Sequence, residues 1–225
     1  MLLLAFDTAT PAVTVALHDG QRVLAEASTV DARRHGELLA PSIAKVIAEA
    51  GAEPRDLTGI AVGVGPGPYT GLRVGVVTAR VLGAVLGIPV HGVCSLDVIA
   101  ADVPRGREFL VATDARRKEV YWARYDAVGV RLEGPAAGSA ASIPGAAGLA
   151  VAGSGGQLYP EAFGAVTGPA YPDARTLCAL AVGARDGQAA VPLLVAEPLY
   201  LRRPDAREPG PPKKVTPPTS SEPSS

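Results

Sequence analysis

The sequence predicts an α/β protein with two similar lobes, each built on a mixed β-sheet. Two observations lead to this prediction. Three strand-like runs at the start of the chain are followed by alternating helix-like and strand-like segments. A strand–turn–strand unit in the second half then repeats the first unit at a constant offset of 107 residues, which places Asp114 on Asp7 and Val120 on Val13. Such self-similarity indicates a duplicated lobe.

The composition is that of a globular chain. Its 225 residues are enough to bury a core, and 48% of them are hydrophobic. The formal net charge of −1 gives no overall field toward nucleic acid or an anionic membrane, so any such contact must be local. Cys94 and Cys178 are too few for a disulfide framework, and the N-terminal run lacks the basic region of a signal peptide. We therefore expect a cytoplasmic protein with reduced thiols.

Most basic residues are arginines, and asparagine is absent from the chain. We interpret this bias as the coding preference of a GC-rich genome. The arginine pairs at residues 33–34 and 116–117 are therefore predicted to be solvated surface rather than an RNA-binding site.

The first three strands are predicted from apolar runs. Residues 2–6 are continuously apolar, residues 12–17 are rich in Val and Thr, and residues 21–27 form a third run. The sequence His-Asp-Gly at residues 18–20 is typical of a hairpin turn. The three strands therefore form an antiparallel meander.

Helices and strands alternate after the meander. Residues 37–50 place apolar side chains on one face at helical spacing. Residues 60–64 are the next strand, residues 70–86 a second helix and residues 88–93 a further strand, and Ser95 is predicted to cap a third helix. This order of elements is that of a ribonuclease-H-like lobe with a mixed sheet.

The second half begins with a strand at residues 108–114 and then repeats the hairpin. Residues 136–150 are rich in Ala and Gly and are predicted to be loop, whereas residues 177–184 are predicted to be helix. A tail rich in Pro and Ser follows, and it is predicted to be disordered. The predicted boundaries are residues 1–104 for the N-terminal lobe, residues 105–203 for the C-terminal lobe and residues 204–225 for the tail.

A glycine- and proline-rich loop, GVGPGPYTGLRVG at residues 63–75, runs into the second helix. Loops of this kind hold phosphate in many enzymes, but this one has no Lys before Thr70 and does not match the dinucleotide-binding spacing. Pro66 and Pro68 also lack the backbone N–H groups that bind an anion. The loop is therefore predicted to be a rigid turn.

The helix after this loop carries a stripe of small residues, because Gly71, Gly75, Ala79 and Gly83 recur at every fourth position. A Gly in a helix interior costs about 1 kcal/mol relative to Ala, so the stripe predicts an unusually close neighbour. That neighbour is either the sheet of the same lobe or a helix of a second chain, and composition favours the sheet. Two arginines within the helix argue against a membrane span.

Polar residues follow the first strand of each lobe. Asp7, Thr8 and Thr10 stand where a ribonuclease-H-like lobe places a metal-linked carboxylate and phosphate-binding hydroxyls, and Asp114 holds the equivalent position in the second half. Two carboxylates across a cleft can hold Mg²⁺ with a nucleotide. The second turn, Ala-Arg-Arg-Lys-Glu, lacks the Gly and Thr of a phosphate-binding hairpin. Capping of the turns is an equally good interpretation.

Other catalytic arrangements are excluded by the residues available. No two of the three histidines, His18, His35 and His91, are three or four apart, so they cannot form a helical metal-binding pair. The chain also has no Gly-x-Ser-x-Gly nucleophile motif. We therefore predict no metal, no cofactor and no catalytic residue.

The motifs FDTAT, GVGPGPYTGLRVG, DARRKEVYWARY and AEPLYLR, in this order and spacing, resemble the bacterial TsaB family over residues 1–203. That family is the dimerization subunit of the machinery that makes threonylcarbamoyladenosine in tRNA. The resemblance implies the two-lobed fold of the actin, sugar-kinase and chaperone-ATPase superfamily. It also implies a partner of related fold, TsaD, whose His-x-x-x-His pair binds the metal of the transferase. This chain lacks that pair, so a pseudoenzyme is expected.

The resemblance also implies an interface, because the family associates through its first two helices, here residues 37–50 and 70–86. The interface residues expected on these helices are Leu38, Leu39, Ile43, Val46, Ile47, Gly71, Leu72, Gly75, Val76, Ala79 and Gly83. The chain departs from the family in its Gly-Pro-Tyr-Thr loop, where Gly-Ser-Phe-Thr is common, and in its Pro-rich tail.

The function expected from the resemblance is a non-catalytic scaffold that binds TsaD in a complex with the ATPase TsaE. Such a complex forms N6-threonylcarbamoyladenosine next to the anticodon of tRNAs that read codons starting with A, and the scaffold meets tRNA indirectly. A homodimer of the isolated chain through the same helices stays open. The alternatives are a small ATPase or kinase that uses Asp7 and Asp114, and a glycoprotease, which requires a metal site that the sequence does not supply.

Overall fold

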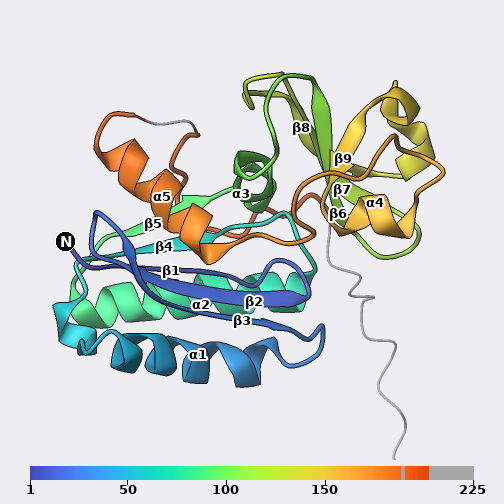
Figure 1. Ribbon diagram of the computed structural model, residues 1–225. Helices are drawn as coiled ribbons and strands as arrows, with labels where there is room; N and C mark the ends of the chain where they lie inside the picture. Colours follow the sequence, from blue (N-terminus) through green and yellow to red (C-terminus); the bar gives the residue numbers. More distant parts are fainter. Residues whose placement is uncertain (189–190, 203–225) are drawn as a thin grey trace, which may run out of the picture.

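Two mixed β-sheets form the centre of the computed structural model, which describes residues 1–188 and 191–202 (Figure 1). The order of elements confirms the predicted α/β fold with two ribonuclease-H-like lobes. The tail predicted to be disordered, residues 204–225, lies outside the described residues.

The elements have the following bounds. The first sheet contains β1 (Leu3–Asp7), β2 (Ala12–His18), β3 (Val23–Val30), β4 (Gly59–Gly63) and β5 (Val90–Val93), and the second contains β6 (Phe109–Asp114), β7 (Val120–Tyr125), β8 (Arg131–Gly138) and β9 (Ala150–Ala152). The helices are α1 (His35–Glu49), α2 (Tyr69–Leu86), α3 (Ser95–Ala101), α4 (Ser154–Leu158) and α5 (Ala174–Arg185), with short 3-10 turns at Pro54–Asp56, Ala140–Ser142 and Ala146–Gly148.

The first sheet has the strand order β3-β2-β1-β4-β5. β1, β2 and β3 form the predicted antiparallel meander, and β4 and β5 add in parallel on the other side of β1. Phe6 lies opposite Val15 of β2 and Val62 of β4. β1, β2 and β4 are buried along their whole length, because helices cover both faces of the sheet. This burial explains why these strands are almost continuously apolar in sequence.

Helices from both halves of the chain cover the first sheet (Figure 1). α1 and α2 pack on one face, where the core includes Phe6, Leu39 and Val76. α5 packs on the other face, where Leu177 joins Ala5 in the core. The predicted lobe boundary after residue 104 falls between α3 and β6, whereas α5 comes after the second sheet and returns to the first.

The second sheet, with the order β8-β7-β6-β9, repeats the meander and adds one parallel strand. Asp114 ends β6 as Asp7 ends β1. The second hairpin is one residue shorter, because Asp114 lies opposite Val120 whereas Asp7 lies opposite Thr14. The constant offset in sequence thus identifies the repeat, but its alignment of Val120 with Val13 is wrong by one residue.

Two other local predictions are wrong. α3 begins at Ser95 and its N-cap residue is Cys94, because the Ser95 hydroxyl donates a hydrogen bond to Asp7 instead of capping the helix. The stretch predicted to be loop, residues 136–150, contains the end of β8, two 3-10 turns and the first residue of β9.

The glycine stripe of α2 packs against the chain's own strands. A Cβ atom on Gly71 would lie 2.6 Å from the carbonyl oxygen of Thr8, and one on Gly75 would collide with the Thr8 hydroxyl. A Cβ atom on Gly83 would collide with the side chain of Val90 in β5. The intramolecular alternative therefore accounts for these glycines, since any larger residue would push α2 away from the sheet.

By length and composition alone, α2 is apolar enough to cross a bilayer. In the structure, however, one face of α2 packs on the sheet through Leu72 and Val76, and its outer side exposes Arg73 and Arg80. A helix that covers a sheet in this way has the same length and composition. We interpret α2 as such a helix.

Replacing Gly by Ala should have opposite effects on stability at the starts of α2 and α1, because only Gly71 of α2 is in close contact with the sheet. Gly71→Ala should lower the free energy of unfolding by about 1–3 kcal/mol, because the methyl group meets a backbone oxygen that cannot rotate away. Gly36→Ala is the matched control in α1, where a Cβ would meet no atom within 4 Å. It should raise that free energy by up to about 1 kcal/mol through helix propensity. Urea unfolding curves measure both, and stabilisation by Gly71→Ala would contradict the packing.

Candidate functional site

Asp7, the predicted metal-linked carboxylate, is fully buried at the end of β1. The Ser95 hydroxyl donates to its Oδ2 at 2.5 Å, and the Ala9 N–H donates to its Oδ1 at 2.7 Å. The Gly65 N–H in turn donates to Ser95 Oγ at 3.1 Å. Burial raises the pKa of Asp7, while the hydrogen bonds from Ser95 and Ala9 oppose this rise. Asp7 therefore ties together β1, the loop before α2 and the start of α3.

The hydroxyls of Thr8 and Thr10 are also used within the fold. Thr8 donates to the carbonyl oxygen of Gly71 at 2.8 Å, and Thr10 Oγ1 accepts from the Ala12 N–H at 3.3 Å. His35 Nε2 donates to the carbonyl oxygen of Thr10 at 2.7 Å. All three side chains are buried, and they line one wall of a hollow of about 250 Å³.

Asp114 caps the turn between β6 and β7. Its Oδ1 accepts from the Arg116 N–H at 2.7 Å, and its Oδ2 forms an ion pair with the Arg116 side chain at 3.5 Å. Among the described residues, no group of three His, Cys, Asp or Glu side chains could hold a metal ion. The geometry of Asp7 and Asp114 thus favours the interpretation as turn caps over a shared metal site.

Ten of the eleven residues expected at a partner interface are buried in the core of the chain itself. These are Leu39, Ile43, Val46, Ile47, Gly71, Leu72, Gly75, Val76, Ala79 and Gly83, and Leu38 is half-buried. They contribute to the packing of α1 and α2 on the first sheet. The exposed surface of the two helices is therefore formed by other residues.

The outer side of α2 carries a row of exposed valines. Val77, Val81 and Val85 are 54%, 55% and 77% exposed, and their spacing of four residues places them on one face. On the outer side of α1, exposed alanines recur at the same spacing, at residues 40, 44 and 48. Sequence reasoning missed the valine row because it followed the glycine stripe, which lies on the opposite face of α2.

A buried polar cluster joins α3 to the second sheet. The Tyr125 hydroxyl donates to Asp97 Oδ1 at 2.7 Å, and Arg131 Nη1 lies 3.4 Å from the same oxygen. Burial raises the pKa of Asp97, while Arg131 and Tyr125 oppose the rise. Every group of this cluster has a partner from another element, which is the pattern of a structural brace between the lobes.

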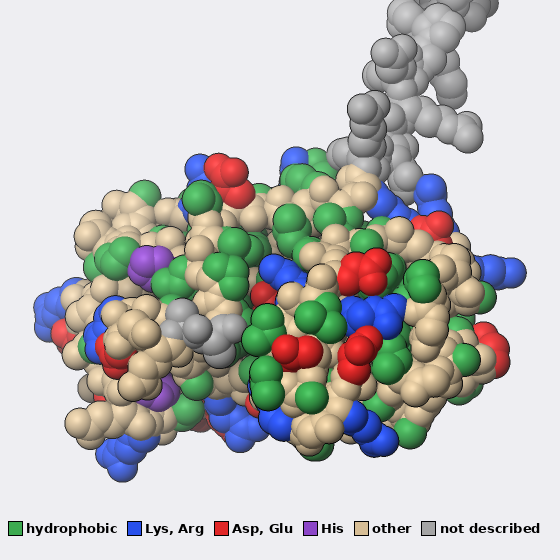
Figure 2. All heavy atoms as spheres, turned by 90° about the horizontal axis from the view of Figure 1, so that it is seen from above, with side chains coloured by type: hydrophobic (Ala, Val, Ile, Leu, Met, Phe, Trp, Pro, Cys, Tyr) green, Lys and Arg blue, Asp and Glu red, His purple; other side chains and the backbone are tan. Residues whose placement is uncertain are grey.

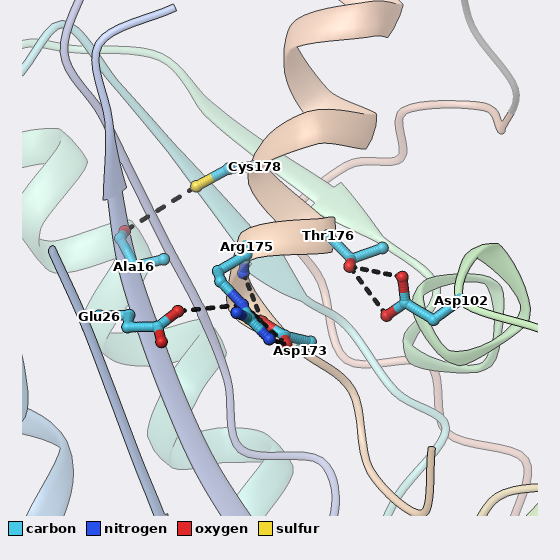
Figure 3. A network of polar contacts seen from close by, with 7 residues as sticks. All are labelled: Ala16, Glu26, Asp102, Asp173, Arg175, Thr176 and Cys178. Carbon is cyan, nitrogen blue, oxygen red and sulfur yellow. Dashed lines mark hydrogen bonds and ion pairs between the residues drawn. The ribbon is translucent and has the colours of Figure 1, made fainter. Parts of the chain in front are cut away.

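A second polar network fixes the start of α5 (Figure 3). Asp173 accepts from the Arg175 N–H at 2.8 Å as the N-cap, and Arg175 also reaches Glu26 of β3 at 3.0 Å. Thr176 donates to the carboxylate of Asp102 at 2.8 Å. All of these side chains except Thr176 border a hollow of about 500 Å³, in which Arg175 pairs with Glu26 and Asp173. The network anchors the helix.

The segment at residues 199–202 connects the two lobes at their mouth. The Leu199 N–H donates to the carbonyl oxygen of Val64 at 2.8 Å, and Arg202 donates to the carbonyl oxygen of Ala115 at 3.0 Å. Tyr200 stacks on Tyr69 with ring centroids 5.2 Å apart. The Tyr200 hydroxyl also accepts from Arg73 Nε at 2.7 Å. This segment holds the start of α2 next to the turn between β6 and β7.

Comparison with known proteins agrees with this architecture. A family model described as "TsaD: tRNA N6-adenosine threonylcarbamoyltransferase" matches residues 22–161. TsaB of Bacillus subtilis, a tRNA threonylcarbamoyladenosine biosynthesis protein, is 37% identical over 129 residues, which is 56% of this chain and 55% of that protein. A crystal structure from Pseudomonas aeruginosa, described as similar to the peptidase YeaZ, has a TM-score of 0.74 and 30% identity over 89% of this chain and 99% of its own. The chain belongs to the TsaB (YeaZ) family.

The match to the TsaB family confirms the resemblance predicted from sequence, and it places the chain in tRNA threonylcarbamoyladenosine biosynthesis. A more similar relative is an uncharacterized protein of Mycobacterium tuberculosis, which is 48% identical over 208 residues, or 91% of this chain and 93% of the relative. The name of the matching family model refers to the transferase, but that name alone does not make this TsaB protein a catalyst.

Burial of Asp7 predicts a pH dependence of stability. In the folded chain Asp7 holds its proton to a higher pH than in the unfolded chain. Stability should therefore fall as pH rises from the ordinary carboxyl pKa of about 4 through the raised value. Asp7→Asn should make this decrease shallower, and Ser95→Ala should make it steeper because it removes a donor to the charged form. Urea unfolding between pH 4 and 8 measures the slopes, and identical slopes in all three proteins would contradict the assignment.

Proposed function

We propose that this TsaB protein is a non-catalytic subunit that binds a TsaD-type transferase through the outer side of α1 and α2. The single observation that carries the proposal is the exposed valine row of α2 in a chain of this family. Exposed apolar side chains are ordinary when they are scattered, but three in one row form a continuous apolar surface. Small residues along the outer side of α1 would let a partner helix approach closely.

The hydrogen bonds that the acidic and histidine side chains make within the chain support a non-catalytic role. Asp7 is enclosed by Ser95 and Ala9, and Asp114 caps its own turn. His35 donates to a backbone carbonyl, and His18 Nδ1 accepts from the Gly20 N–H at 2.8 Å. A catalytic acid, base or metal ligand has to reach the substrate or the ion. These side chains are instead committed to the backbone and to each other.

The proposal includes the setting in which the subunit acts. The TsaD-type partner would carry the transfer chemistry, and a TsaE-type ATPase would belong to the same cytoplasmic complex. The product would be N6-threonylcarbamoyladenosine next to the anticodon of tRNAs that read codons starting with A. In the absence of the partner, the same valine row could pair with a second copy of the chain.

A single charge placed in the valine row tests this interface. Val81→Arg should weaken binding of the TsaD-type transferase at least about 100-fold, because an unpaired charge would be buried there at a cost of several kcal/mol. The control is Val128→Arg, since Val128 is similarly exposed but lies in the turn after β7. Co-purification and titration calorimetry measure binding, and nucleoside analysis of tRNA from a depleted strain measures function.

The results separate the proposal from its alternatives. Unchanged binding and full restoration of the modified nucleoside by Val81→Arg would show that the interface is elsewhere. Micromolar binding of Mg-ATP by the isolated chain, lost in Asp7→Asn, would instead support the small ATPase or kinase. Unfolding curves of both Arg variants should match the wild type, because substitutions at exposed positions rarely change stability by more than about 0.5 kcal/mol.

A further inference from the structure

Two adjoining hollows lie at the mouth between the lobes, and we call them together the basic hollow. One has a volume of about 250 Å³ and the other about 160 Å³, and they share Pro68, Tyr69 and Arg116 in their walls. The β1–β2 loop, the start of α1, the loop before α2, the β6–β7 turn and the segment at residues 199–202 all contribute to them. The basic hollow is thus built from both lobes.

The charge of the basic hollow has one sign. Arg33, Arg116, Arg117 and Arg202 line it, and no carboxylate among the described residues does. The larger hollow beside α5 is different, because three carboxylates border it together with Lys45 and Arg175. On the face of the molecule in Figure 2, acidic and basic side chains are likewise interspersed. In a chain with a net charge of −1, a hollow whose charged lining residues, among those described, are all arginines is a local feature that fits an anion.

The β6–β7 turn presents its cations in an unusual backbone conformation. Arg116, Arg117 and Lys118 have φ angles of 62°, 54° and 62°, which is the left-handed region. This region costs a residue with a side chain roughly 1–2 kcal/mol. The hydrogen bonds from the Arg116 N–H to Asp114 and from the Glu119 N–H to Arg116 hold the turn. Strained backbone of this kind is concentrated at functional sites, and here it carries three consecutive exposed cations, of which Arg116 and Arg117 line the hollow.

Two carboxylates lie behind this rim rather than in the basic hollow. Asp114 pairs with Arg116, and Glu119 pairs with Arg202. The Arg116 side chain is 58% exposed, so it keeps donors for a ligand. The carboxylates therefore position the arginines on the hollow.

The surroundings of the arginines favour a polymer over a small nucleotide. A nucleotide bound with Mg²⁺ needs a carboxylate near its phosphates, but Asp7 is buried and bonded to Ser95. Sites for small ligands also enclose most of the ligand, whereas Arg33, Arg116 and Arg117 are exposed around the rim. Cations spread over several segments suit a chain of phosphates that crosses the surface.

Aromatic side chains stand among these arginines. Tyr69 and Tyr200 are 37% and 40% exposed and stack on each other, and Tyr121 also lines the hollow. Arginines interleaved with aromatic rings are the composition with which proteins bind unpaired RNA, through phosphate contacts and stacking. The sequence prediction that the arginines at residues 116–117 are only solvated surface did not take this neighbourhood into account.

We propose that the basic hollow binds RNA directly, with Arg33, Arg116 and Arg117 on its phosphates. The RNA class rests on the proposed function, in which the substrate is a tRNA. This contact differs from the indirect role expected from the family resemblance. It would give the TsaB subunit a part in holding the tRNA while the partner carries out the transfer.

Binding of an unmodified tRNA transcript to the full chain tests the site. The variant Arg33→Gln, Arg116→Asn and Arg117→Asn removes three cations, and Asn tolerates the left-handed turn. Its dissociation constant, measured by fluorescence anisotropy at 50 mM salt, should rise at least about tenfold. The slope of log K against log salt should also become shallower by about 2, because fewer phosphates are neutralised. The control Arg22→Gln, Arg55→Gln and Arg107→Gln removes the same charge elsewhere and should change neither value.

Three outcomes would overturn the proposal. They are no tRNA binding by the wild type at 50 mM salt, equal losses in both triple variants, or displacement of the tRNA by micromolar Mg-ATP, which would reveal a mononucleotide site. Co-purification with the TsaD-type transferase separates this test from that of the proposed function. The Arg33, Arg116 and Arg117 variant should retain the partner, whereas Val81→Arg should lose the partner and keep tRNA binding. If the chain bound tRNA through these arginines but did not co-purify with a TsaD-type transferase, the RNA site would be supported. Only the proposed function would then be refuted.

Discussion

The close approach of α2 to the first sheet is the constraint on which the rest of the molecule depends. Gly71 and Gly75 bring the helix onto Thr8, whose hydroxyl donates to the Gly71 carbonyl oxygen. With the helix in this position, the loop before it meets Ser95, which in turn holds Asp7. The same contact turns the valine row outward and sets Tyr69 against Tyr200. One packing contact thus determines both the exposed face of α2 and the mouth between the lobes.

The polar groups at the mouth between the lobes are used within the fold itself. Asp7 and Asp114 stand at equivalent strand ends, where one is enclosed by hydrogen bonds and the other caps a turn. The turn after Asp114 carries arginines and lysine instead of the small residues of a phosphate-binding hairpin. The charged side chains that line this mouth in the described part of the chain are all arginines.

Much of the fold could be predicted from the sequence, because the buried strands β1, β2 and β4 are largely apolar runs and the two main helices have clear periodicity. The partner surface could not be read in the same way. The helical spacing of residues such as Leu39, Val46 and Gly75 predicts that they are buried. It does not show whether the chain's own sheet or a partner buries them. The valine row was visible as a second periodicity on α2, but only the packing of the opposite face shows that it is exposed.

Interactions between distant segments also lay beyond sequence reasoning. Ser95 was expected to cap its own helix, yet its hydroxyl reaches Asp7, 88 residues earlier in the chain. The link from Tyr125 to Asp97 and the convergence of Arg33 with Arg116 likewise depend on how the two lobes are placed. Local patterns identify these residues as polar and leave their partners undetermined, since the partners are chosen by tertiary packing.

The central claim is that the outer side of α2 is the surface covered by a TsaD-type transferase. Amide hydrogen exchange of the whole chain, measured alone and in the presence of that transferase, tests it most directly. The account predicts slower exchange on binding in residues 69–86 and 35–49, with little change in residues 150–185. Slower exchange confined to the second sheet, with α2 unaffected, would contradict it.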